Sequence, residues 1–206
     1  MRYENEIVGK DAKKMTPKPE PKPVEPVENI SVAKNVFYLV RDILVALAVI
    51  IIALQFVKPT IVFEHSMENT LKPEDYVFLS KQAYKLFGEI EFGDIVVCES
   101  TLVDDRGVPK NLIKRVIGLP GDELQIKDDA VYRNGERLVE PYTKDGLTDG
   151  VMATITVPPD SYFLLGDNRE VSRDSRSPEI GFVSGDMIRG KVIFRLFPIS
   201  SMGAVR

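Results

Sequence analysis

The stretch from Ile43 to Val57 reads ILVALAVIIIALQFV and carries no charged residue. Upstream it continues into further apolar residues, interrupted only by Arg41 and Asp42. An α-helix rises about 1.5 Å per residue, so about 20 apolar residues cross the hydrocarbon core of a bilayer. A buried helix of a soluble core is the alternative, but this run is apolar on every side and not along one stripe. The sequence therefore predicts a transmembrane helix over residues 35–57.

The residues before this helix have the composition of an unfolded tail. Proline occupies nearly every second position between Thr16 and Glu28, and it fixes φ and lacks an amide donor. We expect residues 1–34 to form a disordered Pro-rich cytoplasmic tail. Lys and Arg are more frequent on this side, whereas only Lys58 lies close on the other side, which predicts a cytoplasmic N-terminus and an extracytoplasmic remainder.

Residues 58–206 are predicted to form a compact all-β domain, either a barrel or packed sheets, so the fold class is mainly β. Short apolar or alternating segments are separated by Gly and Pro turns, and Asn134-Gly135 is typical of a tight hairpin. Helical periodicity is weak except around Lys81–Phe87. The expected strands are 61–63, 76–80, 95–98, 112–117, 123–127, a hairpin over 130–139, 153–157, 162–165 and 192–196.

Composition excludes several classes of function. The net charge of −4 gives no reason to expect nucleic-acid binding. Cys98 is the single cysteine, so no intramolecular disulfide forms, and its apolar neighbours indicate a packing role. His65 is the single histidine, so the chain offers no zinc cluster, and we expect neither a metal nor a cofactor.

A hydroxyl nucleophile with a lysine base remains possible. Ser66, which follows the apolar stretch closely, is a candidate nucleophile. The adjacent His65 is a poor base for it, because adjacent side chains of an extended chain point to opposite faces. Lysine acts as a base only when neutral, which requires burial to lower its pKa from about 10.4. Lys114 and Arg115 both have apolar same-face neighbours, but a guanidinium does not deprotonate. The alternative interpretation of Ser66 is a turn serine. The alternative for Lys114 and Arg115 is that both are amphipathic residues on a solvated sheet edge.

Three segments together resemble the type I signal peptidases, which are membrane-bound Ser-Lys proteases. Ser66–Leu71 (SMENTL) resembles the nucleophile box, Lys114–Asp122 (KRVIGLPGD) matches the lysine box, and Gly166–Arg176 (GDNREVSRDSR) matches the third box. Gly93–Val97 resembles a fourth, weaker box. The resemblance covers roughly residues 36–200.

The resemblance implies a role for each matching residue. Ser66 is the expected nucleophile, and its backbone amide is expected to stabilise the oxyanion. Lys114 is the expected general base and then the acid that protonates the leaving amine. Ser172 is expected to orient the lysine, while Asp174 and Arg176 provide structural support. Asp167–Arg169 are expected to shape the turn that presents Ser172.

Two positions depart from the family pattern. The family has proline where this chain has Asn69, and proline would stiffen the turn behind the nucleophile. Two residues before the serine, the family has serine or glycine, whereas this chain has Glu64. Ionised glutamate only accepts hydrogen bonds and cannot donate to an oxyanion, so we expect Glu64 to point away.

The function implied by the resemblance is removal of N-terminal signal peptides from exported preproteins by a serine endopeptidase anchored in the plasma membrane. Preproteins and the lipid bilayer are the expected partners, with no nucleic acid and no metal. Two other hypotheses are a non-catalytic membrane-tethered scaffold, favoured by Asn69 and Glu64, and a self-cleaving Ser-Lys repressor. The repressor would need a DNA-binding helix-turn-helix, where this chain has a proline-rich tail and an apolar run.

Overall fold

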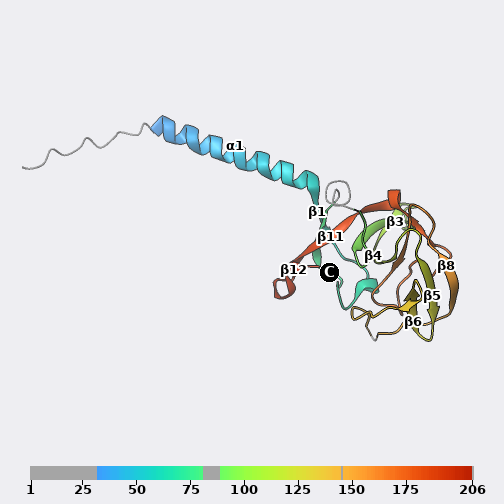
Figure 1. Ribbon diagram of the computed structural model, residues 1–206. Coiled ribbons are helices and arrows are strands. Elements are labelled where there is room, and N and C mark those ends of the chain that lie inside the picture. The colour runs from blue at the N-terminus through green and yellow to red at the C-terminus, as the bar shows by residue number, and fades with distance from the viewer. Residues whose placement is uncertain (1–31, 81–88, 145, 206) are drawn as a thin grey trace, which may run out of the picture. The chain divides into compact units, whose positions relative to one another are not determined.

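The computed structural model describes residues 32–80, 89–144 and 146–205 (Figure 1). The predictions for the proline-rich tail and for a helix near Lys81–Phe87 concern residues outside the described ranges, except for the last residues of the tail. The chain divides into two units after Leu44, and each is described by itself.

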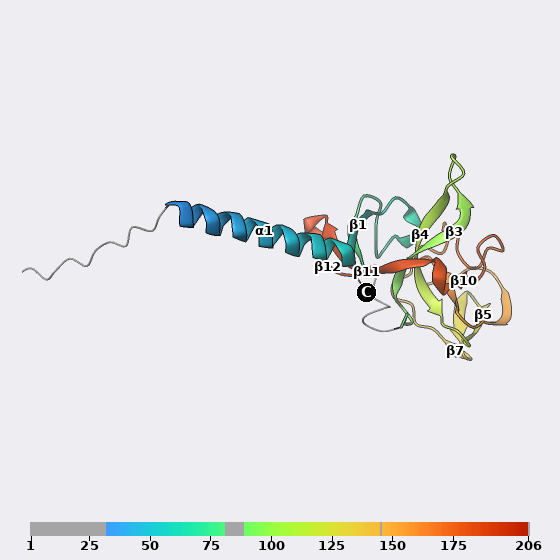
Figure 2. The same ribbon diagram turned by 90° about the horizontal axis from the view of Figure 1, so that it is seen from above.

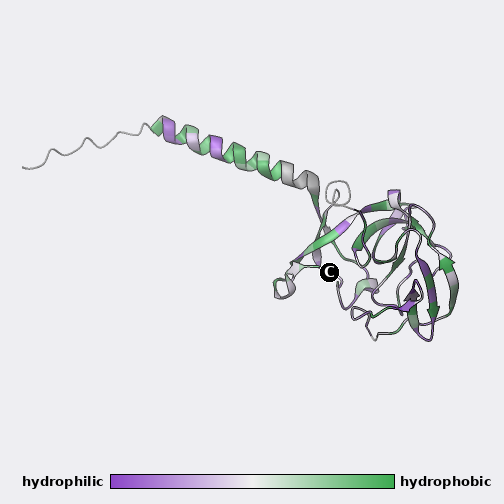
Figure 3. Cartoon of the chain, viewed as in Figure 1, coloured by the Kyte–Doolittle hydropathy of each residue, from purple (hydrophilic) through white to green (hydrophobic). Residues whose placement is uncertain are grey.

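Helix α1 extends from Val32 to Phe56 and includes nearly all of the predicted helical segment. Its described side chains are exposed, and most are apolar, as the colouring of Figure 3 shows. Arg41 and Asp42 form an exposed ion pair within it. In the described part of the chain, no helix combines the length and the apolar character needed to cross a membrane.

The rest of the described chain is built from antiparallel strands in two sheets, so the mainly β prediction is confirmed. The larger sheet has the order β1-β2-β11-β3-β4-β9-β10, with β12 paired to β11. Its strands are β1 (Val57–Ile61), β2 (Tyr76–Ser80), β3 (Ile95–Val103), β4 (Pro109–Gly118), β9 (Ser161–Leu165), β10 (Val183–Ser184), β11 (Ile188–Phe197) and β12 (Gly203–Ala204). The smaller sheet has the order β7-β6-β5-β8 and contains β5 (Glu123–Lys127), β6 (Ala130–Arg133), β7 (Glu136–Arg137) and β8 (Met152–Thr156).

The predicted strands differ from the observed ones mainly at their ends. The segment predicted as a strand at 61–63 is the end of β1 and the loop after it, because β1 begins at Val57 and pairs with β2 from there. β3 and β4 are longer than predicted and form a hairpin that projects from the sheet (Figure 2). The two-residue strands β10 and β12 were not predicted, since segments this short carry no periodicity.

Three buried apolar clusters hold these strands together. One joins β2, β3 and β11 and includes Val62, Met67 and Leu71 from the loop that follows β1. A second joins β4 and β9 to the smaller sheet, and the third packs β3 and β4 against β9 and β10. The loop after β1 is therefore fixed by its own apolar side chains, which matters because it contains Ser66.

Strand β4 is paired unevenly along its length. It pairs with β3 from Pro109 to Arg115, but with β9 only from Arg115 to Gly118. Among the described residues, the half of β4 before Lys114 thus has a strand partner on one edge alone. Backbone groups on such an edge are able to pair with an extended chain.

Candidate active site

Ser66 lies in a short 3-10 helix, η1 (His65–Met67), that follows the extended residues after β1. The turn is closed by the Thr70 and Leu71 amides, which donate to the Met67 carbonyl at 3.0 and 2.8 Å. The Asn168 amide donates to the Ser66 carbonyl at 3.0 Å, which ties this turn to the loop after β9. Ser66 is 6% exposed. Ser66 is therefore a buried residue in a hydrogen-bonded turn, and not a solvent-exposed turn serine.

Lys114 lies in the middle of β4 and is 1% exposed. Its Nζ atom lies 2.7 Å from Ser66 Oγ, within hydrogen-bond distance. Burial lowers the pKa of Lys114, because desolvation penalises the ammonium, while the Glu64 and Asp174 carboxylates act in the opposite direction. The alternative of a solvated sheet edge is therefore wrong for both Lys114 and the equally buried Arg115.

Ser172 lies beside the same turn but is not hydrogen-bonded to Lys114. Its Oγ atom is buried and has no hydrogen-bond partner among the described residues. A methyl group added at Gly166 would lie 2.2 Å from Ser172 Oγ and 2.5 Å from the Ser66 carbonyl oxygen. Gly166 thus allows the backbone of the loop after β9 to pass between these two groups.

Asp174 and Arg176, for which the resemblance implies a supporting role, form an ion pair. Arg176 donates from Nε and Nη2 to the two Asp174 carboxylate oxygens at 2.8 and 2.9 Å. Asp174 also accepts the Gly166 amide at 3.1 Å, and Arg176 donates to the Arg169 carbonyl at 2.7 Å. The Ser172 amide donates to the Asn168 carbonyl at 3.1 Å. These contacts fix the loop that contains Ser172.

A buried ion pair not predicted from the sequence lies next to Lys114. Arg115 donates to both carboxylate oxygens of Asp167 at 2.8 Å and to the Gly93 carbonyl at 2.8 Å. Its guanidinium stacks on the Tyr142 ring, 4.1 Å from the centroid, and it also contacts Thr70. The sequence identifies Arg115 only as a residue that cannot act as a base. Its equal share of apolar neighbours was the signal that it too would be buried.

A second buried ion pair joins Arg169 to Glu140, which sequence reasoning missed entirely. The guanidinium contacts both carboxylate oxygens, and the side chains are 3% and 5% exposed. Arg169 Nε donates to the Gly166 carbonyl at 3.0 Å, and Arg169 also contacts Thr148. Glu140 accepts from the Tyr142 hydroxyl at 2.9 Å. No local pattern around Glu140 distinguishes it from a surface acid.

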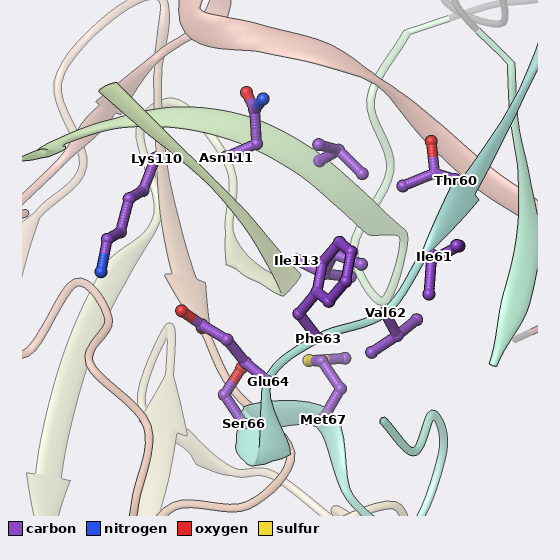
Figure 4. Close-up of a pocket in the computed structure, with 11 residues that line it drawn as sticks. Thr60, Ile61, Val62, Phe63, Glu64, Ser66, Met67, Lys110, Asn111 and Ile113 are labelled. Carbon is purple, nitrogen blue, oxygen red and sulfur yellow. The ribbon is translucent and has the colours of Figure 1, made fainter. Parts of the chain in front are cut away.

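Ser66 opens into a cleft of about 420 Å³ between the loop after β1 and the half of β4 with one free edge (Figure 4). The lining residues are Thr60, Ile61, Val62, Phe63, Glu64, Ser66, Met67, Val97, Lys110, Asn111 and Ile113. The expectation that Glu64 points away from the site is wrong, because its side chain lines the same cleft as Ser66. The extended backbone at Glu64, with φ −103° and ψ 157°, places it there.

The second departure, Asn69, has a conformational reason. Its φ of 92° lies in the left-handed region, which asparagine tolerates better than most residues. Proline is fixed near −65° and cannot adopt this angle. The backbone of the turn behind Ser66 therefore has a conformation that asparagine adopts and proline cannot.

The remaining polar candidates lie outside this constellation. His65 is exposed, and its Nδ1 pairs with the Glu68 carboxylate at 2.6 Å. Cys98 is buried, and burial raises the pKa of its thiol to about 11, consistent with packing. Within the described ranges, no group of three or more His, Cys, Asp and Glu residues is arranged to hold a metal ion.

A serine hydroxyl within hydrogen-bond distance of a buried lysine, at the bottom of an open cleft, has the chemistry needed for nucleophilic attack on a carbonyl. These features define a class of candidate hydrolases. The family model for "signal peptidase, peptidase S26" matches residues 36–197. The chain therefore belongs to the peptidase S26 family of signal peptidases.

Similar proteins carry corresponding names. Signal peptidase IB of Staphylococcus aureus (strain COL) is 36% identical over 81% of this chain and 92% of its own length. Signal peptidase I S of Bacillus subtilis (strain 168) is 33% identical over 85% of this chain and 96% of its own length. A solved signal peptidase I from Enterococcus faecalis V583 is 32% identical, with a TM-score of 0.41, over 50% of this chain and 96% of that chain. Membership of this family supports signal-peptide removal by a serine peptidase.

Proposed function

We propose that this protein cleaves signal peptides from exported preproteins with Ser66 as nucleophile and neutral Lys114 as general base. The observation that carries the proposal is the 2.7 Å contact between Ser66 Oγ and the buried Lys114 Nζ. Lys114 removes the hydroxyl proton as Ser66 attacks the scissile carbonyl, and the proton then passes to the leaving amine. Water, activated by the same lysine, hydrolyses the resulting acyl-enzyme.

The groups around the dyad support this chemistry. The Ser66 backbone amide donates to the developing oxyanion, because the carboxylate of Glu64 cannot donate. Ser172 Oγ, buried and without a partner, is available to orient the lysine when substrate closes the site. Asp174 and Arg176 hold the Ser172 loop in place. No metal or cofactor takes part in this mechanism.

The substrate binds as an extended chain in the cleft. The half of β4 before Lys114 has one edge without a strand partner among the described residues, and this half lines the cleft. Addition of a strand to such an edge supplies main-chain hydrogen bonds that do not depend on the substrate sequence. An enzyme with many preprotein substrates benefits from this form of recognition.

We further propose that α1 anchors the enzyme in the plasma membrane. The uncharged run Ile43–Val57 and the exposed apolar side chains along α1 support an anchor. In this proposal residues 1–34 are a cytoplasmic tail, residues 35–57 cross the bilayer, and residues 58–206 form the extracytoplasmic peptidase domain. A signal peptide is itself a membrane segment, so anchoring both molecules in one bilayer raises their effective concentration.

A non-catalytic scaffold is the second candidate function. Glu64 in the cleft favours it, since a carboxylate near a developing oxyanion opposes the reaction. Asn69 no longer favours it, because its backbone angle suits asparagine.

The test is cleavage of a purified preprotein in detergent or lipid by the wild type, Ser66→Ala and Lys114→Met across pH 6–10. We expect cleavage by the wild type alone, at least about 1,000-fold above either variant. The rate should rise with pH along a limb centred below the ordinary lysine pKa of about 10.4, because the neutral amine is the active form.

Folding of each variant is checked by circular dichroism and thermal unfolding, and methionine matches lysine closely in length. Cleavage that survives in Lys114→Met would remove the proposed base from the mechanism. A folded wild type that cleaves none of several preproteins would favour the scaffold.

A further inference from the structure

The cleft beside Ser66 has two chemically different ends. Figure 4 shows the carboxylate of Glu64 and the amino group of Lys110 on one side, whereas Phe63 and Val62 lie on the other. The apolar wall suits uncharged substrate residues. The other side carries one acidic and one basic side chain, and binding of apolar substrate residues does not account for them.

Both charges act on neighbouring groups only through space: Glu64 raises the pKa of Lys114, and Lys110 lowers the pKa of Asp104. Among the described residues, Glu64 and Lys110 form no hydrogen bond or ion pair through their side chains. This contrasts with Arg115, Arg169 and Arg176, each of which is bonded to a carboxylate. An unpaired charge that lines a cleft loses water when a substrate enters, so its cost or benefit depends on the substrate.

In the proposed chemistry Glu64 transfers no proton and only raises the pKa of Lys114 through its charge. It accepts hydrogen bonds but donates none, so it does not stabilise an oxyanion. It precedes Ser66 by two residues, lines the same cleft and acts electrostatically on Lys114. Its effect falls on the substrate residues that flank the bond to be cut.

We propose that Glu64 makes the cleft selective for charge, favouring substrates with a basic side chain beside the scissile bond and rejecting those with an acidic one. This inference rests on the proposed function and names a specificity determinant within it. The attraction and the rejection both contribute to the preference.

Lys110 gives the cleft a second, separate preference. It precedes Lys114 by four residues of a strand that rises about 3.3 Å per residue, so its backbone lies about 13 Å from that of the lysine. In this proposal Lys110 acts on substrate residues further from the cut than those near Glu64, and with the opposite sign.

The experiment uses the full chain in a neutral detergent, which removes attraction of basic substrates to anionic lipids. One preprotein is prepared with Lys, Gln or Glu at each of the two positions on either side of the cut. We expect kcat/KM for Lys to exceed that for Glu about fivefold or more at one of these positions, and the ratio to fall below about twofold in Glu64→Gln. A ratio between substrates of one enzyme cancels any change in the pKa of Lys114.

Two control variants keep the comparison specific. Glu136→Gln removes an equal charge from the exposed strand β7 and should leave the ratio unchanged. Lys110→Gln should leave the Lys-to-Glu ratio unchanged at positions beside the cut. The same variant should reduce a preference for acidic residues further from the cut. High salt should weaken the wild-type ratio, because exposed charges are screened.

The outcomes separate this inference from the proposed function. A wild type that cleaves all the substrates equally, or a ratio that persists in Glu64→Gln, would overturn charge selection alone. If the wild type cleaves nothing, the proposed function fails. In that case, fluorescence anisotropy measures the affinity of Ser66→Ala for peptides that carry Lys or Glu beside the cut. This tests charge selection directly, and equal affinities would overturn it.

Discussion

At the scale of single residues, the proposed chemistry depends on the position of Lys114 in the chain and on its burial. Its same-face neighbours in the sequence already indicated an apolar setting, and the structure buries it fully. Glu64 shows the limit of such reasoning. A carboxylate next to a nucleophile was expected to turn away, but the extended backbone directs it into the cleft.

This position of Glu64 predicts a change in pH dependence. Its carboxylate raises the pKa of Lys114 against the larger effect of burial, as do Asp174 and Asp167. In Glu64→Gln the pKa of Lys114 falls, so more of the lysine is neutral at a given pH. We expect the rising limb of kcat/KM to move to lower pH, measured with an uncharged substrate between pH 6 and 10. A limb that moves to higher pH would contradict the electrostatic account.

Gly166 predicts a strong effect from one methyl group. In Gly166→Ala the added Cβ would overlap Ser172 Oγ and the Ser66 carbonyl oxygen, so the nucleophile turn or the loop after β9 must shift. We expect cleavage to fall at least about 100-fold, because displacements near 1 Å have such costs in active sites.

The matched control is Gly203→Ala on β12, where an added Cβ meets nothing within 4 Å. It should retain wild-type activity. Wild-type activity in Gly166→Ala would show that the loop yields without moving Ser66.

At the scale of elements, the strands near the site could be predicted, but the contacts between them could not. Short apolar or alternating segments in the sequence located β2, β5 and β9 to within a residue. The Arg169–Glu140 pair joins segments 29 residues apart, and no periodicity reports on such a partner. The third motif located the loop of Ser172, yet its hydroxyl lacks the predicted bond to lysine.

The Arg169–Glu140 pair predicts an effect on stability and activity together. Glu140→Gln leaves a buried guanidinium without its counter-ion, which should lower the free energy of unfolding by about 3 kcal/mol or more. Activity should fall as well, because Arg169 also bonds the Gly166 carbonyl. Chemical unfolding followed by circular dichroism measures the first effect. Glu136→Gln, an exposed neighbour in sequence, should change stability by less than about 0.5 kcal/mol.

At the scale of the whole molecule, the pattern of short apolar segments predicted a mainly β chain, and the described residues confirm this fold class. The sequence left the choice between a barrel and packed sheets open. The observed answer, one larger and one smaller antiparallel sheet, depends on non-local pairing such as β11 between β2 and β3. Pairing of this kind is set by packing and not by local preference.

The anchor proposal predicts a separation of membrane binding from catalysis. A chain lacking residues 1–56 still begins with β1 and keeps its pairing with β2. It should cleave a short soluble peptide within about threefold of the full chain, but a membrane-inserted preprotein at least about tenfold more slowly. It should no longer float with liposomes. Equal flotation of both chains would assign membrane binding to the β domain.

The half-paired strand β4 also has a consequence for how this protein behaves at high concentration. An edge without a strand partner is open to the edge of a second copy, and this is how sheet proteins aggregate. The half with the free edge begins with Pro109 and Lys110, the two residue types by which exposed edges resist such pairing. Lys110 therefore serves colloidal stability too, and its loss should make the enzyme more prone to self-association between rounds of catalysis.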